Sequence, residues 1–185
     1  MSSGFAGDVA KYYARYRRGY PAPVIDALVS ALQLSSTDTV IDMGCGSGQL
    51  TLPLASQVGR VIGVDPEPDM LEHARAAALD ASADNTEWIR GTASDLDSLA
   101  ARYGGVGAIT LANAIHLVDR VQLFDAAKAA LGPGRGLAII ANGTPLWLQA
   151  TAWSQALRGL ESWLKHRSSA TAALTTRPAR GTQPN

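Results

Sequence analysis

Three alternating glycines follow an acidic residue in the segment DMGCGSG, where Asp42 precedes Gly44, Gly46 and Gly48. Glycine has no Cβ, so such a loop turns tightly and lets a ligand approach its backbone. The apolar run before Gly44 predicts a strand over residues 39–42, and the residues after the loop predict a helix over 49–58. This unit is suited to holding a small ligand, although glycines in a strand-to-helix turn also serve close packing alone.

The glycine spacing argues against a dinucleotide site. The pattern G-x-G-x-x-G, counted from Gly44, requires a glycine at the position of Gln49. The observed D-x-G-x-G-x-G instead resembles the first motif of the Rossmann-like S-adenosylmethionine-dependent methyltransferases of class I, in their small-molecule branch. The resemblance implies that Asp42 lies near the cationic amino end of the cofactor. It also implies that the glycines leave room for the methionine part and the ribose.

A second acidic residue, Asp65, ends the apolar run that predicts a strand over 61–65. Its distance from the glycines is that at which a βαβ unit returns its second strand to the first. A carboxylate there can accept both ribose hydroxyls, and the family resemblance gives Asp65 that role. Asp65 can also cap the helix predicted over 68–79, and the two readings are compatible.

The loop after the strand predicted over 86–90 resembles the adenine-binding stretch of the same family. Many relatives have an acid at the position of Thr92, so here the Thr92 hydroxyl or Asp95 would bond to the adenine amino group. The amide of Ala93 would then meet a ring nitrogen. Asp95 is equally suited to be the N-cap of the helix predicted over 96–103, and both readings stay open.

The loop after the strand predicted over 106–111 carries Asn113 and His116. Asn113 is expected at the cofactor site because the carboxyl ends of parallel strands meet at one edge of the sheet. Methyl transfer mainly needs an acceptor held in line with the methyl group. For a hydroxyl or acidic carbon acceptor, His116 is the candidate general base, since this loop borders the methyl group in relatives. A lone loop histidine is also often a bystander.

The elements that must position these residues alternate regularly along the chain. Five apolar strand-like runs separated by helical segments indicate an α/β fold, a doubly wound Rossmann-like parallel sheet of about five strands with helices on both faces. The ligand is expected beyond the carboxyl ends of the strands, at the switch point. The remaining predicted elements are helices over 23–34 and 120–131 and a strand over 136–141.

Residues 11–20, KYYARYRRGY, interleave basic and aromatic side chains. We name them the lid segment, because they resemble the N-terminal cap of small-molecule methyltransferases. Its tyrosines would cover the cofactor and its arginines would meet a carboxylate of the cofactor or of an acidic substrate. The same interleaving suits single-stranded RNA, or the solvated face of an amphipathic helix. The formal net charge of zero favours the lid over RNA binding.

The composition is that of a soluble globular protein, with 185 residues, 46% of them hydrophobic and 17% charged. One domain is expected over residues 1–165, with a helix over 144–165, followed by a disordered tail over 166–185. The absence of a long apolar run and of a signal-peptide pattern predicts a cytoplasmic protein without membrane contact. No metal site is expected, since the single cysteine, Cys45, has no ligand companion at a useful spacing.

The last predicted strand, 136–141, is followed by too few residues for the final antiparallel strands of the family. The open edge of that strand predicts a homodimer or ready aggregation, or else a chain that is a truncated or frame-altered relative of a longer enzyme. The leading function is methyl transfer to a small organic acceptor. The alternatives are a degenerate noncatalytic cofactor-binding module or partner of a full-length methyltransferase and, less expected, an RNA methyltransferase, because no Asn-Pro-Pro-Tyr-like motif follows the fourth strand.

Overall fold

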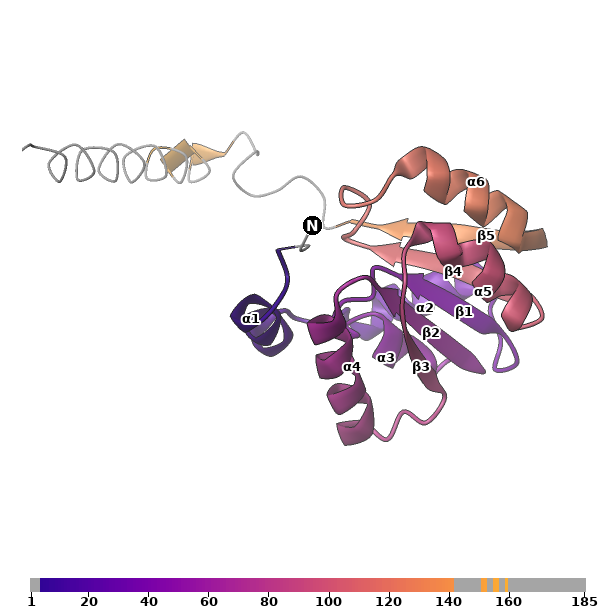
Figure 1. Cartoon of the computed structure of the whole chain (residues 1–185), viewed down its shortest axis with the longest axis horizontal. Coiled ribbons are helices and arrows are strands. Elements are labelled where there is room, and N and C mark those ends of the chain that lie inside the picture. Colours follow the sequence, from indigo (N-terminus) through magenta and orange to yellow (C-terminus); the bar gives the residue numbers. More distant parts are fainter. Residues whose placement is uncertain (1–3, 142–150, 153–154, 157–158, 160–185) are drawn as a thin grey trace, which may run out of the picture. The chain divides into compact units, whose positions relative to one another are not determined.

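The computed structural model describes residues 4–141, 151–152, 155–156 and 159 (Figure 1). The chain divides into two compact units, Met1–Ala141 and Asn142–Asn185, and every element below belongs to the first. In chain order the elements are α1 (Asp8–Tyr16), α2 (Ala22–Ala31), β1 (Thr39–Met43), α3 (Thr51–Ala55), β2 (Arg60–Asp65), α4 (Pro68–Asp80), β3 (Thr86–Arg90), the 3-10 turn η1 (Ala93–Asp95), α5 (Leu96–Arg102), β4 (Val106–Ala112), α6 (Arg120–Ala130) and β5 (Leu131–Ile140).

The five strands form one parallel sheet in the order β3-β2-β1-β4-β5 (Figure 1). In the central register Ile41 of β1 pairs with Ile62 of β2 and with Ile109 of β4. The order reverses between β1 and β4, so the switch point lies at the carboxyl end of β1. The predicted doubly wound α/β fold is confirmed.

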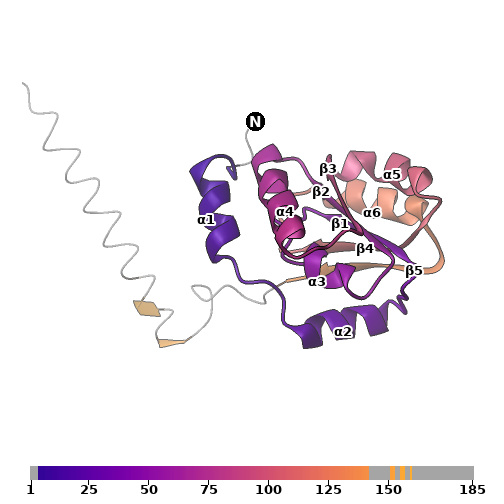
Figure 2. The same cartoon turned by 90° about the horizontal axis from the view of Figure 1, so that it is seen from below.

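Helices cover both faces of the sheet (Figure 2). Helices α5 and α6 pack on one face through Leu96 and Leu123, and α2 and α3 pack on the other through Ile25 and Leu54. These side chains are almost fully buried, as are those of the central strands. Strands covered on both faces must be apolar throughout, which explains the uninterrupted hydrophobic run at Val40 and Ile41.

Two elements differ most in length from the sequence expectation. The helix expected over 49–58 is reduced to α3, five residues long, because the chain before it turns with a bond from Gly48 N to Cys45 O (3.0 Å). The chain after it turns with a bond from Gln57 N to Leu54 O (2.9 Å). The last strand begins earlier than expected, since Leu131 already pairs with Val106 before a register irregularity.

Within the described residues β5 has one neighbouring strand, β4, and lies at the edge of the sheet. The homodimer through this edge stays a prediction. The expected helix over 144–165 and the expected tail over 166–185 lie outside the described residues, apart from five positions of the helix. None of the helices in the described part of the chain is long and apolar enough to span a membrane.

Candidate functional site

The loop of residues 44–48 lies across the end of β2. The amides of Gly44 and Cys45 both donate to the carbonyl of Val64, over 2.8 and 3.1 Å. A loop between β1 and α3 is thereby tied to the neighbouring strand rather than projecting into solvent. The ties place the loop at the switch point of the sheet, where doubly wound folds bind ligands.

The three loop glycines have different reasons to be glycine. All have positive φ, at 65° for Gly44, 55° for Gly46 and 90° for Gly48. A Cβ at Gly44 would lie 2.7 Å from Ala114 Cβ, and one at Gly48 would lie 2.9 Å from Trp88 Cη2. A Cβ at Gly46 would meet nothing closer than 3.7 Å. The protein itself fills the space beside the first and third glycines, and Gly46 is the least crowded.

The carboxylate of Asp65 receives two backbone amides. Its Oδ2 accepts from Gly46 N and its Oδ1 from Glu67 N, each over 2.9 Å. Each carboxylate oxygen has capacity for a second donor. Burial raises the pKa of Asp65, the two backbone hydrogen bonds lower it, and the nearby Glu67 raises it. Both oxygens of Asp65 thus accept backbone amides at the carboxyl end of β2, where the residue is 9% exposed.

The other motif acid, Asp42, lies beneath the loop with 1% of its surface exposed. Its Oδ2 accepts from Thr51 Oγ1 over 2.6 Å, and its Oδ1 accepts from Thr110 Oγ1 over 2.8 Å. The carboxylate thus joins β1, α3 and β4 and is enclosed by two hydroxyls. Burial raises its pKa to about 6, against the opposing effect of the two hydroxyl bonds. Its expected place near the amino end of a cofactor stays a prediction.

The raised pKa makes the stability of the fold depend on pH. The pKa of Asp42 rises from 3.8 to about 6 on folding. Its contribution to the stability of the folded state is therefore complete below pH 3.8 and is lost as the pH rises through about 6. We expect Asp42→Asn to raise the free energy of unfolding by about 1–3 kcal/mol near pH 8. Its advantage should shrink below pH 6. Chemical denaturation of both proteins between pH 4 and 8 measures the difference.

The matched control for this comparison is Thr110→Val. This variant removes one hydroxyl that donates to the Asp42 carboxylate (2.8 Å) and should therefore lower stability most where Asp42 is charged, above pH 6. The titration of Asp65, whose pKa is raised in the same direction, is common to all three proteins. A stability difference between wild type and Asp42→Asn that stays constant with pH would contradict the interpretation.

The loop after β3 forms a capping box. Thr92 N donates to Asp95 Oδ2 over 2.8 Å, and the backbone amide of Asp95 donates to the side chain of Thr92. The same amide also donates to the Thr92 carbonyl over 3.0 Å. Asp95 precedes α5, but its side chain makes no cap bond to that helix and closes η1 instead. Both side chains are exposed, while Ala93 is buried. Asp95 therefore occupies the N-cap position of α5 without a side-chain cap bond, and the adenine contacts of Thr92, Ala93 and Asp95 stay predictions.

The carboxyl end of β4 carries Asn113 in a left-handed conformation with φ of 54°. Its backbone N–H donates to the Ile140 carbonyl of β5 over 2.8 Å, and its side-chain Nδ2 donates to Tyr20 Oη over 2.6 Å. Burial raises the pKa of Tyr20, and the positive charge of Arg17 opposes that shift. The hydrogen bond joins the lid segment to the switch point of the sheet.

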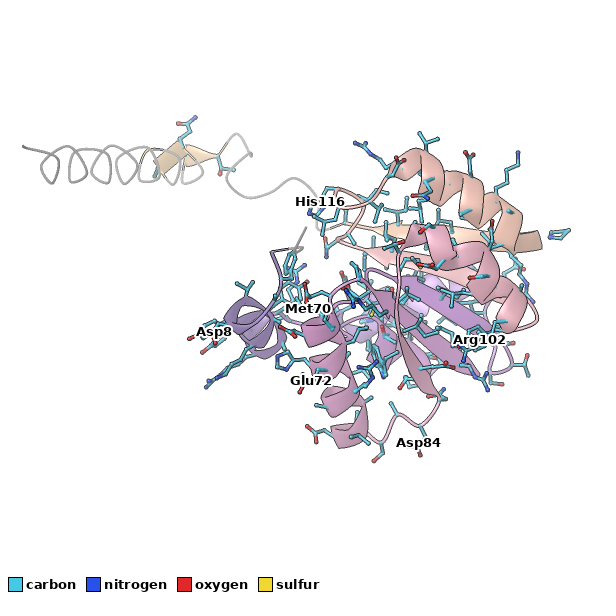
Figure 3. The ribbon with its side chains drawn as sticks, viewed as in Figure 1. Asp8, Met70, Glu72, Asp84, Arg102 and His116 are labelled. Carbon is cyan, nitrogen blue, oxygen red and sulfur yellow. The ribbon has the colours of Figure 1, made fainter. Side chains whose placement is uncertain are left out.

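His116 lies exposed in the turn that follows β4. Figure 3 shows it at the end of the sheet where the strands finish, on the same side as Met70 in the first turn of α4, whereas Arg102 lies at the opposite end. The structure therefore brings His116 to the same edge as Asp65 and Asn113. A catalytic role for His116 remains a prediction.

The lid segment contacts the glycine loop and α4. Helix α1 packs against α4 (Figure 1), and the amide of Gly7 donates to Asp69 Oδ2 over 2.6 Å. A Cβ at Gly46 would lie 3.7 Å from Tyr13 Cε1, so the Tyr13 ring stands beside the least crowded glycine. The guanidinium of Arg17 lies 6.0 Å from the centre of that ring. The N-terminal segment thus covers the loop.

Sequence reasoning missed three parts of this arrangement: the bond from Asn113 to Tyr20, the bond from Gly7 to Asp69 and the packing of Trp88. The two bonds join residues 93 and 62 positions apart, and no local pattern signals them. In the described part of the chain no group of three or more His, Cys, Asp or Glu residues is placed to hold a metal ion.

The comparisons with known proteins find methyltransferases. A family model described as a methyltransferase domain matches residues 40–134. An uncharacterized methyltransferase of Mycobacterium tuberculosis is 34% identical over 142 residues, which cover 77% of this chain and 53% of that protein. The chain spans about half the length or less of the curated relatives it matches first.

Two solved structures share the fold. A putative S-adenosyl-L-methionine-dependent methyltransferase from Methanococcus maripaludis aligns with a TM-score of 0.63 and 18% identity, over 88% of this chain and 75% of that one. A methyltransferase from Thiobacillus denitrificans, solved in complex with S-adenosyl-L-homocysteine, aligns with a TM-score of 0.57 and 19% identity, over 71% and 53% of the two chains.

Proposed function

Because the chain belongs to the class I S-adenosylmethionine-dependent methyltransferases, matched over residues 40–134, we propose that it binds S-adenosylmethionine beside Gly46 and methylates a small organic acceptor. One observation carries this proposal. The Asp65 carboxylate accepts the amide of Gly46 over 2.9 Å, which joins a nearly buried acceptor group to the least crowded part of the loop. A ribose diol needs an acceptor so placed.

The charges of the site suit the proposed cofactor. Asp42 and Asp65 are both buried, and burial is the largest cause of the raised pKa of each. A cation bound nearby favours their charged forms and offsets part of that cost. When bound, S-adenosylmethionine supplies a methyl group on a positively charged sulfur. The homologous fold solved with S-adenosyl-L-homocysteine supports the same choice.

The remaining side chains have complementary roles in this proposal. Asp65 accepts the ribose hydroxyls, while Thr92, Ala93 and Asp95 meet the adenine. Asn113 lies at the methionine end. Asp42 joins β1 to α3 and β4 through Thr51 and Thr110, next to the loop.

The lid segment supports a small acceptor. Tyr13 lies beside Gly46, and Tyr20 is fixed to Asn113, so two aromatic rings narrow the access to the loop. Arg17 lies over the Tyr13 ring, and its positive charge opposes the larger effect of burial, which raises the pKa of Tyr20. We propose that its guanidinium receives a carboxylate of the cofactor or of the acceptor. Such a cover also excludes water from the displacement.

An RNA acceptor is the second candidate, and one observation favours it. Tyr12 and Tyr16 stack with ring centres 6.3 Å apart, and the guanidinium of Arg15 lies 5.4 Å from the Tyr16 ring. The two tyrosines are 58% and 66% exposed, so they offer aromatic faces to solvent. Stacked aromatics beside arginine are typical of surfaces that bind single strands.

Isothermal titration of the purified protein tests the cofactor proposal. S-adenosylmethionine and S-adenosylhomocysteine should each bind with micromolar affinity, whereas NAD, the matched nucleotide control, should give no heat. Absence of binding by a folded sample would overturn the proposal. A transfer assay with a labelled methyl donor, run against small acids and against total RNA, then decides the acceptor. Binding without transfer to either would favour a noncatalytic module.

His116 is proposed as the general base for the acceptor. Replacing it by alanine should lower kcat by roughly 10²–10⁴-fold, because general-base catalysis contributes about that much. Affinity for S-adenosylmethionine should not change, since the histidine acts on the acceptor. His73→Ala, a histidine of α4 with no role in the proposed chemistry, is the control and should retain full turnover. Unchanged kcat in His116→Ala would exclude the base role.

A further inference from the structure

One indole ring fills the space beside two glycines from different parts of the chain. A Cβ at Gly63 of β2 would lie 2.6 Å from Cε3 and Cζ3 of Trp88, and one at Gly48 would lie 2.9 Å from Cη2 of the same ring. Such distances are below any normal carbon contact. The Trp88 ring therefore extends from its own strand, across β2, to the third glycine of the loop.

Gly63 has no conformational reason to be glycine. Its φ is not among the positive values, in contrast to that of Gly48, and it pairs with Trp88 in the regular parallel register. What requires a glycine there is the indole that lies on it. The thiol of Cys45 approaches the same position, at 3.1 Å from a Cβ on Gly63. The β2 glycine and the third loop glycine are thus matched to one side chain.

Three hydrogen bonds also join the loop to β2, and all of them reach residues further along that strand than Gly63. The amides of Gly44 and Cys45 donate to Val64, and Gly46 donates to Asp65. The Trp88 ring supports Gly48, at the end of the loop that those bonds do not reach. The backbone of Trp88 has its own tie to α4, since Arg75 Nη2 donates to the Trp88 carbonyl over 3.0 Å.

We propose that Trp88 is a positioning residue for the cofactor site. Its indole ring keeps the loop of residues 44–48 in the place where Gly46 can donate to Asp65. The consequence for cofactor binding rests on the proposed function; the consequence for the loop does not. A smaller side chain at position 88 leaves a void under Gly48. The loop then loses its contact with the indole ring, while its hydrogen bonds to Val64 and Asp65 remain.

The test compares Trp88→Leu and Trp88→Phe with wild type and with Leu99→Ala. Leu99 of α5 is buried in the core beneath α5 and α6, and Trp88 is not part of that core, so the Leu99 variant reports general destabilisation. Trp88→Leu should weaken S-adenosylmethionine binding by about tenfold or more and speed hydrogen exchange over residues 44–48. Trp88→Phe should recover part of both losses. Leu99→Ala should lower the Tm, with affinity and loop exchange unchanged.

The outcomes separate the two proposals. Loop exchange and affinity that stay unchanged in Trp88→Leu, with only a lower Tm, would overturn the positioning role. If wild type itself does not bind S-adenosylmethionine, the proposed function fails, and the exchange of residues 44–48 still decides the role of Trp88.

A double-mutant cycle adds a test specific to the contact. Gly63→Ala should impair stability and binding, because its methyl group collides with the indole at 2.6 Å. The same substitution combined with Trp88→Leu should cost much less than the sum of the two single changes, since the smaller side chain makes room. Additive effects would show that the ring and Gly63 are not matched.

Discussion

Replacing Asp65 by alanine is expected to weaken S-adenosylmethionine binding by about 1–3 kcal/mol, which is a factor of about 5–150 in affinity. The variant loses the proposed acceptor for the ribose hydroxyls. It also leaves the amides of Gly46 and Glu67 without the carboxylate that accepts both of them now, each over 2.9 Å. The loop and the start of α4 lose a common anchor. Isothermal titration of the folded variant measures the effect.

The conservative change Asp65→Asn is the matched control. It keeps one acceptor oxygen and the shape of the side chain, but it places an amide donor where the second backbone amide or hydroxyl donates. Its affinity should therefore lie between those of wild type and Asp65→Ala. An Asp65→Ala protein that is folded and binds as tightly as wild type would contradict the assignment of Asp65 to the cofactor site.

Replacing either of two loop glycines by alanine should impair a different property: stability at Gly44 and cofactor affinity at Gly46. At Gly44 the methyl group meets Ala114 Cβ at 2.7 Å and the φ of 65° is unfavourable for alanine. Together these should lower the free energy of unfolding by about 2–4 kcal/mol. At Gly46 the φ of 55° costs alanine about 1–2 kcal/mol, but nothing in the protein obstructs the methyl group.

Gly46→Ala should therefore be the better folded variant and the poorer binder. Its methyl group occupies the uncrowded side of the loop, where the cofactor is proposed to approach, and affinity should fall by about tenfold or more. Denaturant unfolding and titration with S-adenosylmethionine measure the two effects separately. A Gly46→Ala protein with normal affinity would place the cofactor elsewhere. Equal stability losses in the two variants would contradict the packing argument at Gly44.

Both predictions concern a loop held from several directions. Val64 and Asp65 hold it from β2, Trp88 supports its third glycine, and the hydroxyls of Thr51 and Thr110 lock Asp42 below it. A loop so supported presents its backbone in one conformation before any ligand binds. Preorganisation of this kind lowers the entropic cost of binding.

Local sequence patterns were enough to predict the fold and the place of the glycine loop within it. The apolar runs at Val40 and Val61 predicted buried parallel strands, because a strand covered on both faces has no polar side to alternate with. The acid and glycines from Asp42 to Gly48 predicted a ligand loop at the switch point, because the spacing of glycines reflects backbone turns that are local. Asp65 followed from the usual length of a βαβ unit.

Only the tertiary structure decided what each of those residues contacts. It distinguished Gly46 from the other two loop glycines. Gly44 and Gly48 have no side chain because Ala114 and Trp88 occupy that space. It turned Asp95 toward Thr92, and it joined Tyr20 to Asn113 across 93 positions of the chain. These contacts arise from how distant elements pack. A pattern with the period of one helix or strand carries no information about them, because packing depends on which elements the sheet order makes neighbours.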